Sequence, residues 1–276
     1  MKAVLPAAGF GTRFLPVSKA VPKELLPLGS KPVIQYVVEE AVAAGCDEIL
    51  VILSRGKEII RKYFEPSPDL ESVLERGGRT RELEGLRAVS SLACFHFVYQ
   101  PEMKGLGDAV LQAREFCGDS PFAVLLADTV IHGPSPLADM WASWSANRTS
   151  CVALEPCPAE RVSRYGIAGG RETGPGHFHI ESMVEKPAAG KVPVMRGSDG
   201  RDLPPHAFAA RYVFTPAIFA ALEKAVPTLN GEIQLTDAMA AVLEREGFRG
   251  VRMAGRRLDI GNPRGLLEAF PLFVEG

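Results

Sequence analysis

The chain has 276 residues, of which 46% are hydrophobic, and its 31 Lys and Arg nearly balance 33 Asp and Glu. This apolar content supports a core of ordinary depth and excludes wholesale disorder. The net charge of −2 argues against a protein built to coat nucleic acid, which needs a positive excess to neutralise phosphates.

In the first half of the chain, short aliphatic runs alternate with segments of helical period. The strands that we expect there are 2–6, 48–53, 95–99, 122–126 and 150–154. The helices expected between them are 32–44, with Ser30 as its cap and Gly45 as its stop, 57–64, 108–116 and 136–146. This alternation predicts a mostly parallel sheet covered on both faces, with ligands beyond the carboxyl ends of its strands.

The pattern changes near Gly166, where strands with turn-rich connections predict an antiparallel or mixed extension of the sheet. The strands expected there are 166–170, 177–185, 208–214 and 248–253, and the helices are 216–224, 234–246 and a last one that begins near Pro263. Residues 190–205 are rich in Gly, Pro and charge, so we expect a surface loop. One compact α/β domain with an embedded second lobe fits this order best.

Cysteine usage and apolar run lengths indicate the compartment. The five cysteines show no C-x-x-C spacing, so we expect reduced thiols instead of disulfides or a zinc site. The apolar stretch 3–8 is too short for a secretion signal, and the longest apolar runs are below the roughly 20 residues that span a bilayer. We expect a soluble, cytoplasmic protein without membrane or nucleic-acid partners.

A glycine-rich turn follows the first expected strand. Gly9 and Gly11 would let backbone N–H groups approach an anionic or flat ligand closely. Phe14 occupies the third glycine position of a dinucleotide-binding fingerprint, and four prolines between residues 16 and 32 forbid a long helix there. Four cations follow the glycines, namely Arg13, Lys19, Lys23 and Lys31. They predict a triphosphate site, and a solvated basic loop is the alternative.

These residues, GFGTRFLPVSKAVPKELLP from Gly9, resemble the nucleotide loop of sugar-phosphate nucleotidyltransferases. Further segments in family order narrow the resemblance to bacterial UTP–glucose-1-phosphate uridylyltransferases, also called UDP-glucose pyrophosphorylases. The segments are DLESVLER from Asp69, KGLGDAV from Lys104, MVEKP from Met183, GEIQLTD from Gly231 and DIGN from Asp259.

The resemblance implies a three-layer, Rossmann-like α/β fold whose mixed, mostly parallel sheet is flanked by helices and carries a smaller sugar-binding lobe. It implies one nucleotidyltransferase domain over 1–276, with about 1–160 binding the nucleotide and about 161–276 binding the sugar and completing the metal site. The implied reaction joins UTP and glucose-1-phosphate into UDP-glucose and pyrophosphate. Such phosphoryl chemistry depends on alignment and charge neutralisation.

The resemblance also assigns roles to single residues. Arg13, Lys23 and Lys186 would be catalytic, the first two on the β- and γ-phosphates and the third on the sugar phosphate. The implied nucleotide-binding residues are Ala8, Gly9, Gly11, Thr12, Gln100 and Gly105. The implied sugar-phosphate-binding residues are Gly166, Glu185, Lys186 and Glu232, with Arg211 and Tyr212 supporting that side.

A metal site and self-association are implied in the same way. Asp128 and Asp259 would hold Mg²⁺, which favours carboxylate and phosphate oxygens. For either aspartate alone, turn or capping chemistry is the alternative reading. Family members commonly form homo-oligomers, here a dimer or tetramer, and the polar helices of 70–86 are a candidate dimer arm.

The chain departs from the family pattern at several positions. Asp108 replaces the usual histidine, where it could also cap a helix, and Ala127 replaces a proline before the metal aspartate. Residues 190–205 are longer than usual, with a Pro-Pro pair for Ser-Asn, and Ala210 replaces a glycine. These last departures lie at the expected sugar wall, so the sequence supports uridylyl transfer more strongly than it supports specificity for glucose. The alternatives are a relative that uses another nucleotide or sugar phosphate, a non-catalytic regulatory paralogue and, more distantly, a dehydrogenase.

Overall fold

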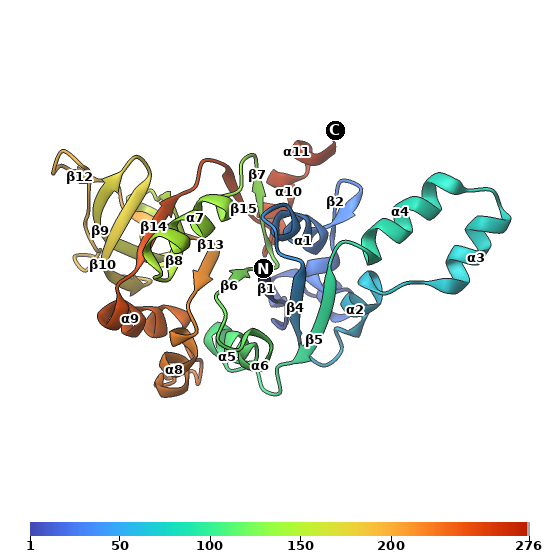
Figure 1. Cartoon of the computed structure of the whole chain (residues 1–276), viewed down its shortest axis with the longest axis horizontal. Coiled ribbons are helices and arrows are strands. Elements are labelled where there is room, and N and C mark those ends of the chain that lie inside the picture. The colour runs from blue at the N-terminus through green and yellow to red at the C-terminus, as the bar shows by residue number, and fades with distance from the viewer. Residues whose placement is uncertain (275–276) are drawn as a thin grey trace.

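The computed structural model describes residues 1–274, which build an α/β fold around one 11-stranded mixed sheet (Figure 1). In spatial order its strands are β12 (Asp202–Leu203), β11 (Met195–Arg196), β9 (Gly166–Gly174), β10 (His177–Glu185), β14 (Arg249–Arg252), β8 (Cys151–Pro156), β13 (His206–Phe214), β6 (Phe122–Leu125), β1 (Lys2–Pro6), β4 (Glu48–Leu53) and β5 (Cys94–Tyr99). The sheet continues without a break from the N-terminal strands into the strands of the second lobe.

Alternate side chains of the central strands enter two separate cores, one on each face of the sheet. In β1, Ala3 and Leu5 pack into one core and Val4 into the other. The helices of the first core are α1 (Val33–Ala43), α2 (Glu58–Phe64), α7 (Leu137–Asn147) and α10 (Pro263–Ala269). Those of the second core are α5 (Gly105–Leu111), α6 (Arg114–Cys117), α8 (Ala217–Lys224) and α9 (Leu235–Glu246). The expected three-layer arrangement is confirmed.

Strand direction divides the sheet into two parts. β1 pairs in parallel with both β4 and β6, and β4 pairs in parallel with β5. Beyond β6 the pairing turns antiparallel through β13, and the lobe built on β9 and β10 is mostly antiparallel. The carboxyl ends of the parallel strands therefore meet the second lobe at β13, as the change of pattern near Gly166 predicts.

A small second sheet connects distant parts of the chain. β7 (Thr129–His132) pairs antiparallel with β15 (Arg256–Asp259), and the register places Asp259 opposite Thr129. Asp259 thus lies beside the residue that follows Asp128. A short hairpin, β2 (Pro27–Leu28) with β3 (Lys31–Pro32), precedes α1, and α11 (Pro271–Val274) follows α10.

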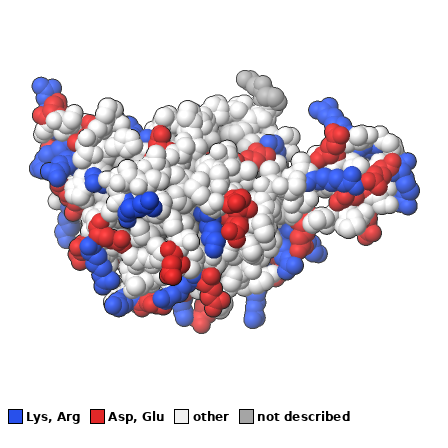
Figure 2. All heavy atoms as spheres, viewed as in Figure 1, with Lys and Arg blue, Asp and Glu red and all other residues white. Residues whose placement is uncertain are grey.

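Two helices, α3 (Pro68–Arg76) and α4 (Thr80–Ser90), form an arm that projects beyond the β5 side of the molecule (Figure 1). Leu74 and Leu83 are buried within it, and Arg87 binds Glu71 and Glu75 at 2.8 and 2.5 Å. Charges of both signs cover this arm in Figure 2. Its expected role in a dimer stays a prediction.

Three details of the sequence-based expectation are wrong. Helix α1 begins at Val33 after Pro32 without a side-chain cap, because Ser30 lies in the turn of the β2–β3 hairpin. The expected helix 108–116 is two helices, α5 and α6. Residues 190–205 are not only a loop, since β11 and β12 form there and Met195 is fully buried beside β9.

None of the helices in residues 1–274 combines the length and apolar character that a bilayer crossing requires.

Candidate active site

Two cavities lie side by side at the carboxyl ends of the parallel strands. The first, of about 420 Å³, opens over the glycine-rich turn, and we call it the nucleotide-side cavity. The second, of about 260 Å³, faces the second lobe, and we call it the sugar-side cavity. Both are lined by Leu106, Leu126 and Asp128, so they meet at Asp128.

Most of the residues assigned to nucleotide binding line the nucleotide-side cavity. They are Ala8, Gly9, Gly11, Thr12, Lys23, Gln100 and Gly105. Glu232 also lines this cavity and is not among the residues of the sugar-side cavity, although we expected it beside the sugar. Its β-carbon lies 3.0 Å from the position that a Cβ on Gly105 would occupy, which explains its place at this side.

The glycine-rich turn has the irregular form that its prolines predict. Gly11 has φ +66°, a left-handed conformation that favours glycine, and leads into three successive 3₁₀ turns, η1 (Thr12–Phe14), η2 (Val17–Lys19) and η3 (Lys23–Leu25). The expectation that no long helix follows the turn is confirmed. Of the four cations expected at a triphosphate, Lys23 lines the nucleotide-side cavity, but Arg13 lines the sugar-side cavity instead. Lys19 and Lys31 line neither cavity, and Lys31 binds Glu39 at 2.8 Å.

A buried ion pair that the sequence did not reveal fixes this turn. The Lys57 ammonium donates to the backbone carbonyls of Ala7 and Gly9 at 2.7 and 2.6 Å, and to both carboxylate oxygens of Glu24 at 2.9 and 2.8 Å. The Glu24 side chain is 1% exposed and that of Lys57 is 9% exposed. Lys57 therefore connects the Ala7 and Gly9 carbonyls to Glu24 in the turn η3.

Burial opposes charge on both partners of this pair. It raises the pKa of Glu24 and lowers the pKa of Lys57, while their mutual attraction acts in the opposite direction on each. The three N–H groups of the ammonium face four oxygen acceptors, so the charged form of the pair is fully hydrogen-bonded. No local motif marks Lys57, because a lysine before a helix is usually a surface residue.

Gln100 is held in one orientation beside the expected base position. Its amide nitrogen donates to the Gly105 carbonyl at 3.2 Å and to the Asp108 carboxylate at 2.7 Å. An ionised carboxylate can only accept, so the –NH₂ end of the amide must face Asp108 and the carbonyl end remains available to a ligand. Asp108 lies inside α5 and caps no helix, which excludes the capping alternative.

Asp128 and Asp259 converge at Gly261. A Cβ added to Gly261 would lie 2.7 Å from Asp128 Oδ2 and 3.1 Å from Asp259 Oδ1, so only glycine leaves room between these carboxylates and the turn. Lys23 donates to Asp128 Oδ2, and Gly261 N donates to Asp259 Oδ1 at 3.0 Å. Burial alone would lower the pKa of Lys23, but attraction to Asp128 and Glu24 outweighs it and raises the pKa.

This pair fits Mg²⁺, which proteins often bind through one or two carboxylates while substrate phosphates and water complete its shell. Within residues 1–274 no group of three or more His, Cys, Asp or Glu side chains could hold a metal. Asp128 and Asp259 would therefore bind Mg²⁺ together with a phosphorylated ligand, since two carboxylates alone leave most of its coordination positions to other ligands.

The sugar-side cavity contains the other expected residues. Arg13, Gly166, Glu185, Lys186 and Asp259 line it. Gly166 permits close packing, since a Cβ there would lie 2.4 Å from the Phe208 ring and 3.0 Å from Glu185 Oε2.

Lys186 is more exposed than Lys23, whose side chain is 16% exposed. The Lys186 side chain is 57% exposed, its ammonium lies 3.4 Å from Glu185 Oε1, and Thr236 donates to the other Glu185 oxygen at 2.7 Å. Lys186 has φ +46°, a conformation that costs a non-glycine residue about 1–3 kcal/mol and clusters at functional sites. The backbone is thus strained where the lysine enters the cavity.

Arg211 acts from behind the cavity. It is fully buried, binds Glu40 through two hydrogen bonds at 3.0 and 2.6 Å, and donates to the Thr129 carbonyl at 2.8 Å. Because Thr129 follows Asp128, Arg211 supports the aspartate's backbone and does not itself line either cavity.

Comparisons with known proteins agree with this geometry. The nucleotidyl transferase family model matches residues 2–275. A UTP–glucose-1-phosphate uridylyltransferase of Bacillus subtilis is 40% identical over 267 residues, covering 96% of this chain and 88% of that protein. The enzyme of the same name from Pseudomonas aeruginosa is 38% identical over 271 residues, covering 97% of this chain and 94% of that one.

Two solved structures are similar over 99% of this chain. A UDP-glucose pyrophosphorylase in complex with UDP-glucose has a TM-score of 0.86, 37% identity and 98% of its own chain covered. A UTP-bound UGPase from Acinetobacter baumannii has a TM-score of 0.88, 33% identity and 92% of its own chain covered.

Proposed function

The chain belongs to the nucleotidyl transferase family, among its UTP–glucose-1-phosphate uridylyltransferases, and on that premise we propose that it forms UDP-glucose by a Mg²⁺-dependent, in-line reaction. UTP occupies the nucleotide-side cavity and glucose-1-phosphate occupies the sugar-side cavity. The observation that carries the proposal is the meeting of the two cavities at Asp128, with Lys23 on one side and Lys186 on the other.

The reaction requires the two phosphates to approach each other where the cavities meet. A phosphate oxygen of glucose-1-phosphate attacks the α-phosphorus of UTP, and a new P–O bond forms. The bond between the α-phosphorus and the oxygen that bridges to the β-phosphate breaks, and its electron pair leaves with pyrophosphate. Two polyanions must be aligned against their mutual repulsion, so cations and positioning supply most of the catalysis.

The cations divide this task. Lys23 from the nucleotide-side cavity and Arg13 from the sugar-side cavity bind the β- and γ-phosphates where the two cavities meet, so they stabilise the charge that grows on the leaving pyrophosphate. Lys186 binds the attacking phosphate, and Glu185 accepts hydrogen bonds from sugar hydroxyls. The strained backbone at Lys186 sets the direction from which its ammonium enters the cavity.

Asp128 and Asp259 would hold Mg²⁺, which would neutralise charge on the substrate phosphates. The approach of the two carboxylates at Gly261 supports this role. Lys23 donates to Asp128, so the cation that would bind the triphosphate lies beside the carboxylate that would bind the metal.

Gln100 would select the base. Its carbonyl, left free by the bonds of its amide to Gly105 and Asp108, accepts from N3–H of uracil, whereas cytosine has an acceptor at N3. Backbone groups of Ala8 and Gly9 contact the same base, next to the phosphate segment at Gly11 and Thr12.

Thymine also carries N3–H, so Gln100 alone does not distinguish UTP from dTTP. This observation favours a thymidylyl-transferring relative as the second candidate. The unusual Pro204 and Pro205 do not line the sugar-side cavity, whereas Ala210 does, so Ala210 is the departure that touches the sugar.

The test is a panel of pyrophosphate release with UTP, dTTP and CTP against several sugar-1-phosphates. We expect the fastest release from UTP with glucose-1-phosphate, no release when EDTA removes Mg²⁺, and recovery when Mg²⁺ is restored. Absence of release from every pair would contradict catalysis, and a preference for dTTP would establish the second candidate.

A further inference from the structure

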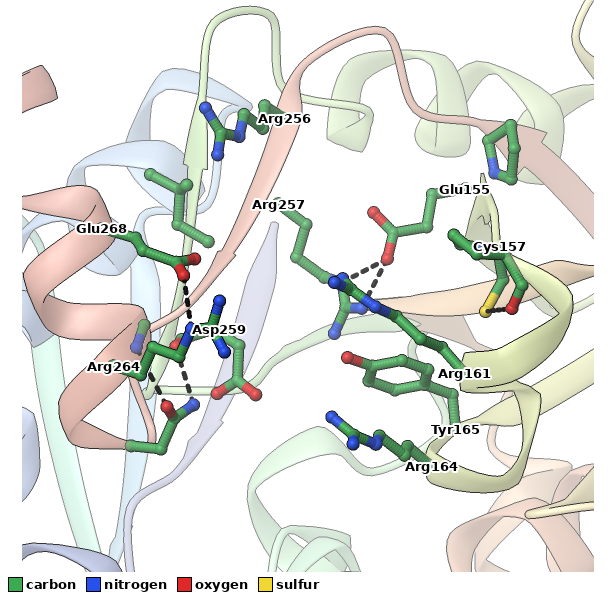
Figure 3. A pocket seen from close by; sticks show the side chains of 15 residues that line it. Glu155, Cys157, Arg161, Arg164, Tyr165, Arg256, Arg257, Asp259, Arg264 and Glu268 are labelled. Atoms are coloured by element: carbon green, nitrogen blue, oxygen red, sulfur yellow. Dashed lines mark hydrogen bonds and ion pairs between the residues drawn. The ribbon is translucent and has the colours of Figure 1, made fainter.

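A third cavity, of about 360 Å³, lies next to the sugar-side cavity and has five arginines in its lining (Figure 3). We call it the arginine cavity. Its arginines come from three elements: Arg161 and Arg164 from η4 (Ala159–Arg164), Arg256 and Arg257 from β15, and Arg264 from α10. In Figure 3, Arg161, Arg164 and Arg257 gather around Tyr165, whereas Arg256 lies apart from them at the top of the view and Arg264 lies near Asp259 at the left.

The carboxylates of this cavity do not balance its cations. The lining holds three of them, Glu155, Asp259 and Glu268, against the five arginines. Glu155 accepts from Arg257 at 2.6 Å, and Glu268 accepts from Arg264 at 2.8 Å. Asp259 accepts from Gly261 and faces the proposed metal position.

Three guanidinium groups remain without an acidic partner. Among residues 1–274, Arg161, Arg164 and Arg256 make no ion pair. Arg161 and Arg164 lie on the same side of the cavity, beside Tyr165, so their planar donors suit binding of the phosphate oxygens of one anion, whereas Arg256 lies apart from them (Figure 3).

The cavity is separate from the substrate phosphate positions. Arg13, Lys23 and Lys186 do not line it. It shares Arg164, Tyr165, Arg257 and Asp259 with the sugar-side cavity, so the two have a common wall. The apolar part of that lining that an organic group could contact is the Tyr165 ring, which Arg257 approaches at 4.5 Å, because Leu258 is 5% exposed and packs into the first core.

We propose that the arginine cavity binds a small phosphate-bearing anion of at least two charges, in addition to the two substrates. Arg161 and Arg164 bind the phosphate oxygens, and Arg257 is fixed in place by Glu155 and Tyr165. The anion is either free pyrophosphate or phosphate, or a phosphate ester whose organic part contacts Tyr165.

The test is calorimetric titration of the UTP-loaded full-length protein with pyrophosphate and, separately, with glycerol 3-phosphate, both in EDTA. This experiment involves no turnover, so its failure and the failure of the proposed function are distinguishable. We expect one site per chain for at least one probe, and the tighter probe identifies the free anion or the ester as the source.

Three variants locate the binding site. Arg161→Gln changes only the arginine cavity, and loss of a charge-assisted contact should weaken binding about tenfold. Lys186→Gln, in the sugar-side cavity, should leave binding unchanged. Arg76→Gln removes the same charge on the arm and should also leave it unchanged.

The proposal is overturned if neither probe binds the unaltered protein. It is equally overturned if Lys186→Gln abolishes binding, which would place the anion at the sugar-phosphate position. Equal weakening by the arm variant and the cavity variant would show general attraction to positive charge and would overturn it as well. Arg161, Arg76 and Lys186 are all exposed, so these variants should fold, which circular dichroism checks.

Discussion

The nucleotide side and the sugar side of the active site differ in how firmly their functional groups are fixed. On the nucleotide side, Lys57 and Glu24 form a buried ion pair that binds the glycine-rich turn, and Asp108 orients Gln100. On the sugar side, Lys186 is 57% exposed and its contact with Glu185 is long, at 3.4 Å. The difference indicates that the glycine-rich turn and the proposed base position are organised before binding, whereas the proposed sugar-phosphate position is completed by its substrate.

Lys57→Met should have the largest effect and would test the organised side. It leaves the Glu24 carboxylate buried without a partner, and breaking a buried pair in this way costs about 3–5 kcal/mol of the free energy of unfolding. It also removes the donor to the Ala7 and Gly9 carbonyls, so the KM for UTP should rise. Urea denaturation and steady-state kinetics measure the two effects.

The double variant Lys57→Met with Glu24→Gln separates stability from positioning. Without the buried charge, much of the lost stability should return, while the KM for UTP stays high because both carbonyls still lack their donor. Full recovery of the KM would show that the ion pair acts on stability alone.

Lys186→Ala tests the open side and should lower activity without lowering stability. Loss of a cation on reacting phosphate typically costs about 10²–10³ in kcat. The side chain is mostly exposed, so the free energy of unfolding should change by less than about 0.5 kcal/mol, and the Kd for UTP should stay the same. Lys191→Ala, also exposed and outside both cavities, is the matched control.

If Lys186→Ala retained full activity, Lys186 would have no part in the reaction. If it weakened UTP binding as strongly as it weakened turnover, the two sides would not be independent, and the contrast between them would disappear.

Asp108→Asn should produce a smaller change, in base selection. The asparagine amide can donate as well as accept, so only the longer bond to the Gly105 carbonyl, at 3.2 Å, still opposes a turn of the Gln100 –NH₂ end toward the base. The turned Gln100 would bind cytosine. One hydrogen bond of this kind corresponds to a loss of about tenfold in the preference of kcat/KM for UTP over CTP. Asp119→Asn, at an exposed acid, should leave the preference unchanged.

The sequence predicted the main strands and helices and most cavity-lining residues. It did not predict the long-range contacts that hold those residues in position. The alternation of strands and helices and the glycine-rich turn are local patterns, so β1, β4 and the irregular segment after Gly9 were predictable. Lys57 and Glu24 are 33 residues apart and meet only through the tertiary fold. β7 and β15 are short and pair across more than a hundred residues, so only the fold reveals that Asp128 and Asp259 share Gly261.

Glu232 and residues 190–205 show a related limit. Glu232 lies at the nucleotide side because Gly105 packs against it, a contact that spacing cannot indicate. The Gly- and Pro-rich composition of 190–205 predicted a loop, but pairing with β9 overrides that local preference and buries Met195.

Ala210→Gly should have the smallest effect, and it tests whether the sugar side carries backbone strain beyond Lys186. Ala210 has φ +60°, a left-handed conformation that costs an L-residue with a Cβ about 1–2 kcal/mol, at the position where the family pattern has glycine. Glycine removes that cost but also removes a buried methyl group and gains freedom in the unfolded chain, so the net change should be close to zero. Ala209→Gly loses a similarly buried methyl at a residue without positive φ, so it should be the more destabilising variant by about 1 kcal/mol in urea denaturation. Equal losses in the two variants would show that the left-handed residue stores no strain, and would leave Lys186 as the strained position of the sugar side.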